Sequence, residues 1–245
     1  MGSEGSAHAA GLGGSGMRIT VPIRATTWTL TAAALVFAAG TLGGYFYKAA
    51  HGHTRSSGLI RLLDVDVETS IPTWFSSAIL LVSAALLAAI GSITRSRGGS
   101  ALPWYGLAII FVGLSSDETA VIHEMAHGLI AMTVDFDNPL KTFWVYPYAA
   151  FAIAVLVVYW RFLFGLPART RRLFLVAGGL YVIGALGGEV VSVQFWKPEE
   201  TQSFAFVAVS VVEELLEMLG VIVFIHTLLE YLRDHVGEVS LEVKR

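Results

Sequence analysis

The segment HEMAH at residues 123–127 has the residue types and the spacing of a metal site. On a helix, side chains four residues apart lie about one turn apart on one face, so the imidazoles of His123 and His127 can bind the same ion. Glu124 can polarise a water molecule on that ion and act as a general base. The spacing predicts a divalent metal site, with zinc favoured and Glu124 as the catalytic residue.

The H-E-x-x-H motif at these positions resembles that of the zincin metallopeptidases. Because the motif lies in an apolar stretch, the chain resembles the intramembrane, site-2 type in particular. The resemblance implies that His123 and His127 are zinc ligands, that Glu124 is the general base, and that the protein is a zinc-dependent membrane hydrolase or peptidase. The chain departs from those proteases because no Asp-Gly ligand motif follows downstream. The third ligand is therefore left open.

Carboxylates in two later segments are candidates to complete the site. Glu189 in GALGGEVVS follows small residues that let helices approach closely, so its side chain can reach a neighbouring helix. The segment VVEELLEMLG supplies Glu213, Glu214 and Glu217, of which at least two share a helix face. We predict that the metal ligands come from these four glutamates together with the two histidines.

Asp117 and Glu118 lie just before the motif, in SSDETAVIHEMAH. If one helix runs through this sequence at about 100° per residue, Asp117 shares a face with His123, Glu124 and His127, whereas Glu118 does not. Ionisable groups inside a bilayer cost about 2.5–3.5 kcal/mol each on the insertion scale, so these side chains are expected to face the interior of a bundle. We expect Asp117 and Glu118 to surround the ligands without binding the ion.

The number of carboxylates also indicates a second kind of metal site. Glu124 and His127 form an E-x-x-H pair, and Glu214 and Glu217 form E-x-x-E, which together suit a dinuclear carboxylate site in a helix bundle. Oxygen ligands of this type bind iron or manganese at least as well as zinc. A di-iron or di-manganese membrane oxidoreductase is therefore the alternative, although the chain has one E-x-x-H where such sites usually have two.

Two further alternatives need no metal. Buried His and Glu side chains can form a proton or cation pathway, in which desolvation keeps some carboxyls protonated. They can also join helices by hydrogen bonds in a non-enzymatic accessory subunit of a membrane complex. The sequence leaves both possibilities open and does not indicate a substrate.

The elements that must position these residues are apolar. The chain has 245 residues, of which 55% are hydrophobic and 14% charged, and its mean hydropathy is +0.66. These values are typical of an integral membrane protein. Residues 17–245 are predicted to form a single all-α, polytopic bundle of about six transmembrane helices, after a flexible tail at residues 1–16. The six apolar runs are Trp28–Phe46, Ile71–Ile93, Leu102–Val134, Phe143–Phe164, Leu173–Phe195 and Phe204–Leu232.

Charge in the loops predicts the orientation of the bundle. With both termini in the cytoplasm, most of the 16 Lys and Arg residues lie inside, and only Lys48, Arg55, Arg61, Lys141 and Lys197 lie outside. The expected location is the cell membrane, as the inner membrane of a bacterium or archaeon. The expected partners are the lipid bilayer and other membrane subunits, and no basic tract indicates nucleic acid. Since the chain has no cysteine, metal ligands must be His, Asp or Glu.

Overall fold

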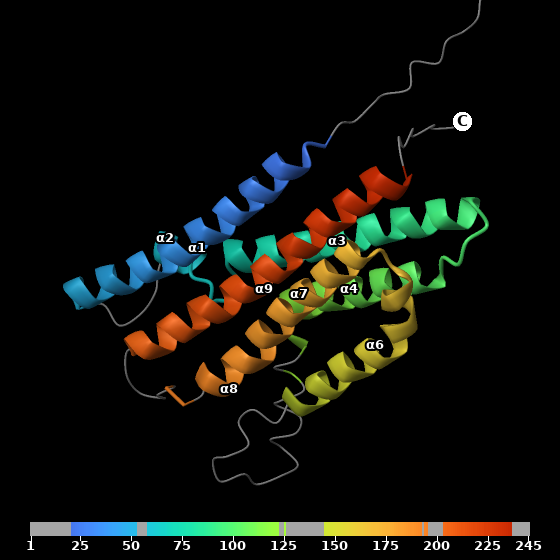
Figure 1. The fold of residues 1–245 in the computed structure, drawn as a ribbon. Coiled ribbons are helices and arrows are strands. Elements are labelled where there is room, and N and C mark those ends of the chain that lie inside the picture. The colour runs from blue at the N-terminus through green and yellow to red at the C-terminus, as the bar shows by residue number, and fades with distance from the viewer. Residues whose placement is uncertain are drawn as a thin grey trace, which may run out of the picture.

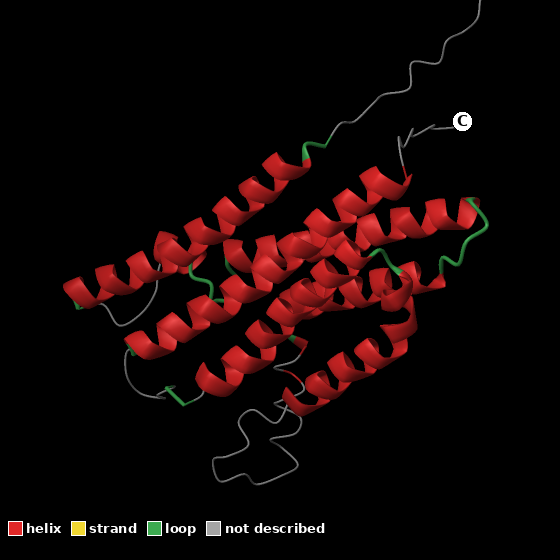
Figure 2. Cartoon of the chain, in the orientation of Figure 1, coloured by secondary structure: helices red, strands yellow, loops and turns green. Residues whose placement is uncertain are grey.

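The computed structural model describes residues 21–52, 58–122, 125, 145–192, 194–195 and 203–236, and the regular structure in these ranges is entirely helical (Figure 2). Four helical segments are long and apolar enough to cross a membrane: α1 (Ile23–His51), α3 (Ile71–Ser96), α6 (Val145–Gly165) and Ala168–Ser192. The last segment consists of α7 (Ala168–Val182), the π-helical turn η1 (Ile183–Gly188) and α8 (Glu189–Ser192). The prediction of an all-α membrane protein is confirmed at this level.

Two other long helices complete the bundle, α4 (Leu102–Ala120) and α9 (Phe204–Tyr231). Neither is among the four candidate spans, and both contain carboxylates within an otherwise apolar sequence. The short helix α2 (Gly58–Leu62) precedes α3, and a π-helical turn, η2 (Leu232–Val236), follows α9. All the predicted apolar runs coincide with a helical segment except Leu102–Val134, which is interrupted.

The interruption lies at Val121, where α4 ends. The N–H of Val121 donates to the carbonyl of Asp117 at 2.8 Å, and Val121 has a φ of 54°. A β-branched residue in this left-handed region is strained. The prediction of one continuous helix from Asp117 through His127 is therefore wrong, because the chain changes direction before the motif. Nothing in the sequence signals this break, since the position holds neither glycine nor proline.

Ordinary capping residues explain the other helix ends. Ser70 and Ser203 precede α3 and α9, and their hydroxyls accept the N–H groups of Thr73 at 3.3 Å and Phe206 at 3.2 Å. At the end of α1, Gly52 takes a φ of 66°, a conformation that glycine adopts without strain. The helix α6 ends before a proline at position 167, which disfavours helix in the preceding residue.

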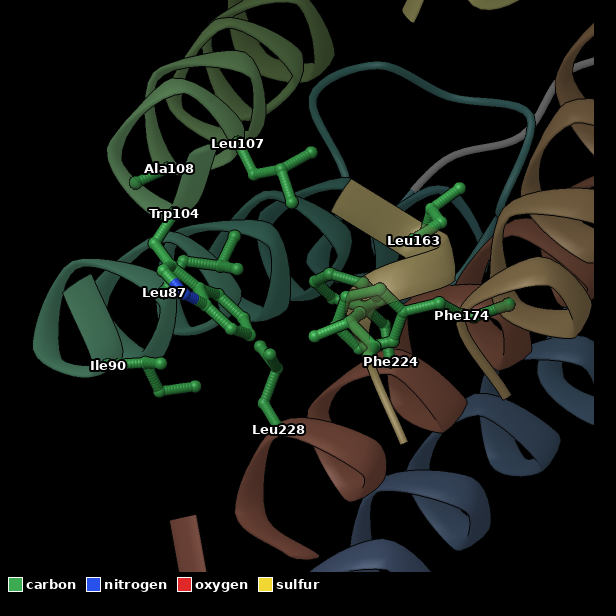
Figure 3. Packing of buried hydrophobic residues seen from close by; sticks show 11 residues of the cluster. Leu87, Ile90, Trp104, Leu107, Ala108, Leu163, Phe174, Phe224 and Leu228 are labelled. Atoms are coloured by element: carbon green, nitrogen blue, oxygen red, sulfur yellow. The ribbon is translucent and has the colours of Figure 1, made fainter. Parts of the chain in front are cut away.

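Helix α9 lies at the centre of the bundle, where it contacts α1, α3, α7, η1 and α8 (Figure 1). Its buried side chains join two apolar cores. One contains Met218 and Ile222 with residues of α1 and α3. The other contains Phe224 and Leu228 with residues of α3, α4, α6 and α7 (Figure 3). Since α9 contacts most of the bundle, polar groups on it can meet polar groups from several segments.

The bundle has two distinct ends, which are visible in Figure 1. The basic end is where α1 and α7 begin and α3 and α9 end, and it contains Arg24, Arg95, Arg97, Arg169 and Arg233. At the opposite end, which we call the acidic end, α1 and α4 finish and α3, α6 and α9 begin. The candidate site described below lies toward the acidic end.

Candidate functional site

The glutamates of α9 lie against a glycine-rich surface of the preceding segment. A Cβ added at Gly188 would lie 2.6 Å from side-chain atoms of Glu213. A Cβ added at Gly184 would lie 2.8 Å from the Glu213 carbonyl oxygen and 2.9 Å from Cγ of Glu217. Both glycines are therefore needed for the close approach of the two segments, as the small residues before Glu189 indicated.

The approach involves a π-helical turn at Ile183–Gly188, directly before Glu189. A π-turn inserts an extra residue into the helical repeat and so rotates the residues after it relative to those before it. Such turns occur often at functional sites. Here the turn lies where the glycines face α9 and Glu189 begins the next helical turn.

Helix α4 adds Asp117 and Glu118. It is held against α3 by a hydrogen bond of 2.8 Å between the hydroxyls of Ser77 and Ser115. The hydroxyl of Tyr148 in α6 donates to Oδ1 of Asp117 at 3.3 Å. The negative charges of Glu118 and Asp117 act on Glu217 of α9. The acids of α4 and α9 therefore approach one another, while the predicted roles of Asp117 and Glu118 around a bound ion stay predictions.

A third contribution comes from the loop between α2 and α3, which the sequence analysis did not include in the site. The hydroxyl of Thr41 in α1 donates to the carbonyl of Leu63 at 3.1 Å and accepts the N–H of Val65 at 3.0 Å. Val65 is buried in the core with 4% of its surface exposed. These contacts fold the loop inward and bring Asp64, Asp66 and Glu68 toward α8 and α9. The only sequence signal is the alternation of acids with apolar residues in LLDVDVE.

The pKa of Asp66 shows how the neighbouring carboxylates affect this loop. The surrounding protein removes part of the hydration of its carboxyl, although one side of the residue stays exposed. The negative charges of Asp64, Glu68 and Glu189 add to this effect, so the pKa of Asp66 rises to about 6 in spite of a hydrogen bond from Ser210. Asp66 therefore connects the loop electrostatically to α8 and by a hydrogen bond to α9.

We call these carboxylates together the acid cluster: Asp64, Asp66, Glu68, Asp117, Glu118, Glu189, Glu213, Glu214 and Glu217. In the described part of the chain, the charges that act most strongly on Asp66, Glu214 and Glu217 are all carboxylates of this cluster. Asp64 is buried, Asp66 and Glu68 are exposed, and the other six carboxylates are half-buried. Like charges held close together raise the energy of the folded chain, and bound cations or bound protons would lower it.

One neutral side chain close to the cluster lacks a partner. Ser76 in α3 is 7% exposed, and its hydroxyl is the one buried side-chain oxygen or nitrogen among the described residues with no hydrogen-bond partner. The guanidinium of Arg97 donates to the carbonyl of His235 at 2.8 Å, which aligns the parallel helices α3 and α9 at the basic end. Ile79 and Leu80, about one turn after Ser76, share a core with Met218, about one turn after Glu214, so Ser76 lies on the part of α3 that precedes this shared core as Glu214 does on α9. A polar ligand between these helices would satisfy the Ser76 hydroxyl.

His123, Glu124 and His127 lie outside the described residues, so the structure does not test their predicted roles. In the ranges that are described, no three His, Asp or Glu side chains are arranged as a metal site. The structure does bring together Asp117, Glu118, Glu189, Glu213, Glu214 and Glu217, all of which the sequence had selected. The strained Val121 lies two residues before His123.

Comparison with known proteins adds the family. A family model described as a domain of unknown function, DUF8692, matches residues 27–232. The chain belongs to the DUF8692 family. No curated protein and no solved structure matches it. The DUF8692 match contains every residue of the acid cluster and the H-E-x-x-H segment, so all of them belong to the family domain.

The other polar centre of this DUF8692 chain lies at the basic end. Nδ1 of His226 lies 2.9 Å from the Thr27 hydroxyl, and Nε2 lies 3.6 Å from Glu230. Nη2 of Arg169 donates to Glu230 at 2.9 Å. His226 is thus a packing histidine whose partners, Thr27 and Glu230, lie at the basic end and not in the acid cluster.

Proposed function

We propose that this DUF8692 protein is an integral membrane metalloprotein whose acid cluster, with His123, Glu124 and His127, binds divalent metal ions. The proposal includes six transmembrane helices with both termini in the cytoplasm. It is supported by the four apolar helical segments and by the arginines at the basic end, which follow the positive-inside rule. In this arrangement α4 and α9 are the two spans that contain the carboxylates, and the surrounding apolar helices shield them from lipid.

The observation on which the proposal rests is the convergence of carboxylates from four separate segments. Glutamates of α9 meet those of α4 and α8 and the acids of the loop before α3, and no cation is among the charges with the largest effects on Asp66, Glu214 and Glu217 in the described part of the chain. A divalent ion would neutralise this charge and supply a ligand for groups such as the Ser76 hydroxyl. The residue types fit metal ions that prefer oxygen ligands.

The number of carboxylates favours a dinuclear iron or manganese centre, and hence a membrane oxidoreductase. A single zinc ion with four ligands would use His123, His127 and at most one or two carboxylates. Most carboxylates of the acid cluster would then not be used as ligands. Two ions would use more of them, with Glu118, Glu189, Glu213, Glu214 and Glu217 as the residues that could hold these ions.

A zinc-dependent hydrolase is the second candidate, because the H-E-x-x-H spacing favours it. In this case His123 and His127 bind zinc and Glu124 activates water. The location proposed for either enzyme is the cell membrane of a bacterium or archaeon, where the bilayer and other membrane subunits are its partners.

The experiment that tests the proposal is metal analysis of the full chain purified without chelator. Two iron or manganese ions per chain support the dinuclear site, and one zinc ion supports the hydrolase. His123→Ala and His127→Ala should each lower the metal content sharply, because each removes a ligand. His226→Ala is the matched control and should not. A fully folded wild type that contains and binds no metal would overturn the proposal in favour of a proton pathway or an accessory subunit.

The role of Glu124 separates the two metal sites. If Glu124 is a general base, Glu124→Gln keeps the zinc and loses hydrolysis. If it is a ligand of a dinuclear centre, the neutral amide binds a hard cation more weakly and the metal content falls. Glu214→Gln and Glu217→Gln should then both lower the metal content. A mononuclear site would be sensitive to one of them at most.

A further inference from the structure

An apolar cavity adjoins the acid cluster. It has a volume of about 600 Å³ and lies between α6 on one side and α4, α7, η1 and α9 on the other. This volume is within the range of about 300–1,000 Å³ that is typical of small-molecule sites. Glycines on α7 help to leave this space open, since a Cβ added at Gly178 or Gly179 would meet no atom within 4 Å.

Side-chain contacts between α4 and α6 define the length of the cavity. At the acidic end, the hydroxyl of Tyr148 is hydrogen-bonded to Asp117. Toward the basic end, the Tyr159 hydroxyl lies against Gly106, and the rings of Phe162 and Trp104 are 4.9 Å apart. From Tyr148 to Tyr159 the helix rises about 17 Å. Beyond Tyr159 the cavity is bounded by the core that contains Leu163, Phe174 and Phe224 (Figure 3).

The cavity is lined mainly by apolar side chains. The polar side-chain groups on its walls are the hydroxyls of Tyr148, Tyr159 and Tyr181. Tyr148 contacts Asp117, and the charge with the largest effect on Tyr181 is that of Glu217. These two tyrosines therefore connect the cavity to the acid cluster. At the far end the Tyr159 hydroxyl packs against Gly106, and the other side chains there, such as Leu163 and Phe174, are apolar.

We propose that the cavity binds a single-chain lipid from the bilayer, with its hydrocarbon chain along α6 and an uncharged or cationic polar end toward the acid cluster. The site lies beside two of the candidate membrane-spanning segments, so a bilayer lipid can reach it. An anionic head group would be repelled by the carboxylates. We further infer that such lipids are the substrates of the metal site, an inference that rests on the proposed function.

The dimensions argue against a helix of a partner protein as the occupant. A helix that crosses the membrane is about 30 Å long. The contact of Tyr159 with Gly106 and that of Phe162 with Trp104 join α4 to α6 and close the cavity before the basic end, so a helix of that length cannot lie between them. A single hydrocarbon chain fits a narrow site of this length.

Photolabelling of the full chain in phospholipid nanodiscs tests the proposal. The probe is a trace amount of a long-chain fatty alcohol that carries a diazirine, and mass spectrometry identifies the labelled peptides. A diazirine near the hydroxyl should label residues around Tyr148 and Tyr181, and one near the chain end should label residues around Tyr159 and Phe174. An excess of unlabelled fatty alcohol should compete, and the fatty acid of the same length should compete less at pH 8.

Two variants fill the cavity from opposite walls, Gly178→Leu in α7 and Ala152→Leu in α6. Each should reduce labelling at least several-fold. Gly113→Leu is the matched control, because Gly113 is also open to an added Cβ but does not line the cavity. Labelling that is spread equally over the outward residues Val157 and Val158, or that persists in both filled variants, would overturn the proposal. The proposal would also be overturned if a second polypeptide bound in the cavity and prevented labelling.

The labelling does not depend on metal, so the two proposals can fail separately. The same measurements on chelator-treated protein should give the same labelled peptides. A metal-free wild type with specific, competable labelling would overturn the metal site and leave the lipid site supported. Normal metal content with labelling spread over the lipid-facing surface would overturn the lipid site and leave the metal site supported.

Discussion

The two polar regions of α9 balance their charges in different ways. At the basic end, the carboxylate of Glu230 is 14% exposed and has three positively charged or chargeable neighbours: Arg169 at 2.9 Å, His226 at 3.6 Å and Arg233 at 3.8 Å. In the acid cluster, the charges with the largest effects on Asp66, Glu214 and Glu217 are other carboxylates. The chain itself supplies the counter-ions of the first region, whereas in the second region we propose that bound metal ions neutralise the carboxylates.

The comparison shows why a buried charge by itself does not indicate a function. Glu230 and Glu217 lie on the same helix, but Glu230 has counter-ions from α7 and η2 and is explained as a structural group. Glu217 is surrounded by acids from other segments, an arrangement that costs stability unless a ligand or protons compensate. The predictions below test this difference.

The largest effect is expected where the helix with Glu189 approaches the acid cluster. Gly184→Ala would place a Cβ 2.8 Å from the backbone oxygen of Glu213, which cannot move aside easily. We expect a loss of about 1–3 kcal/mol in stability, measured as thermal unfolding in detergent. Gly187→Ala is the control, since its Cβ would meet only Ile183 at 3.8 Å. If both variants were equally stable, η1 and α9 would not approach each other at Gly184.

The second prediction is that removing the charge of Glu217 and removing the charge of Glu230 change stability in opposite directions. In chelator-treated protein at pH 8, Glu217→Gln removes one of several repelling charges and should raise stability by about 1 kcal/mol. Glu230→Gln weakens its pairs with Arg169 and Arg233 and should lower stability by about 1 kcal/mol. Unfolding in detergent measures both. Losses in both variants would show that the charge of Glu217 is already compensated without metal.

Much of this arrangement was predictable from the sequence. Apolar runs of membrane length determine where the helices lie, and capping residues such as Ser70 and Ser203 set their beginnings. Glu189, Glu213, Glu214 and Glu217 were recognisable because carboxylates in apolar segments are unfavourable without partners. Local sequence was sufficient for these features because each depends on neighbouring residues of one helix.

Other features depend on contacts between distant segments. Asp64 and Asp66 belong to the cluster only because Thr41, in α1, fixes the loop backbone. The placement of Asp117 and Glu118 relative to the H-E-x-x-H segment could not be read from periodicity, because an ideal helix was extended past Val121, where the chain takes a left-handed conformation. Neither the tertiary hydrogen bond nor the strained residue has a local signature, so periodicity could not reveal them.

A third, smaller effect concerns the hydrogen bond at the basic end. Thr27→Val removes the hydroxyl that lies 2.9 Å from Nδ1 of His226 while keeping the shape of the side chain. We expect a loss of about 1 kcal/mol, because one neutral hydrogen bond is lost and the ring nitrogen is left unpaired. Thr29→Val, at an exposed position of the same helix, is the control and should have little effect. Metal content should not change in either variant, which would confirm that the two regions are independent.

The last and smallest effect compares the response of the two regions to pH. The pKa of Asp66 is raised from 3.8 to about 6, so the folded protein binds this proton more tightly than the unfolded chain does. Its contribution to stability is full below pH 3.8 and is lost as the pH rises through 6. The groups facing it are Asp64 and Glu68 from its own loop, Glu189 from α8 and Ser210 from α9. Asp66→Asn should therefore reduce the fall in melting temperature between pH 4 and pH 6.

At the basic end the sign is reversed, because the hydrogen bond from Arg233 lowers the pKa of Asp234. Its contribution is present above pH 3.8 and is lost as the pH falls through the lowered value, so Asp234→Asn should change the melting temperature only above that range. Identical pH profiles for the wild type and Asp66→Asn would show that the loop carboxyl is hydrated and not part of the acid cluster.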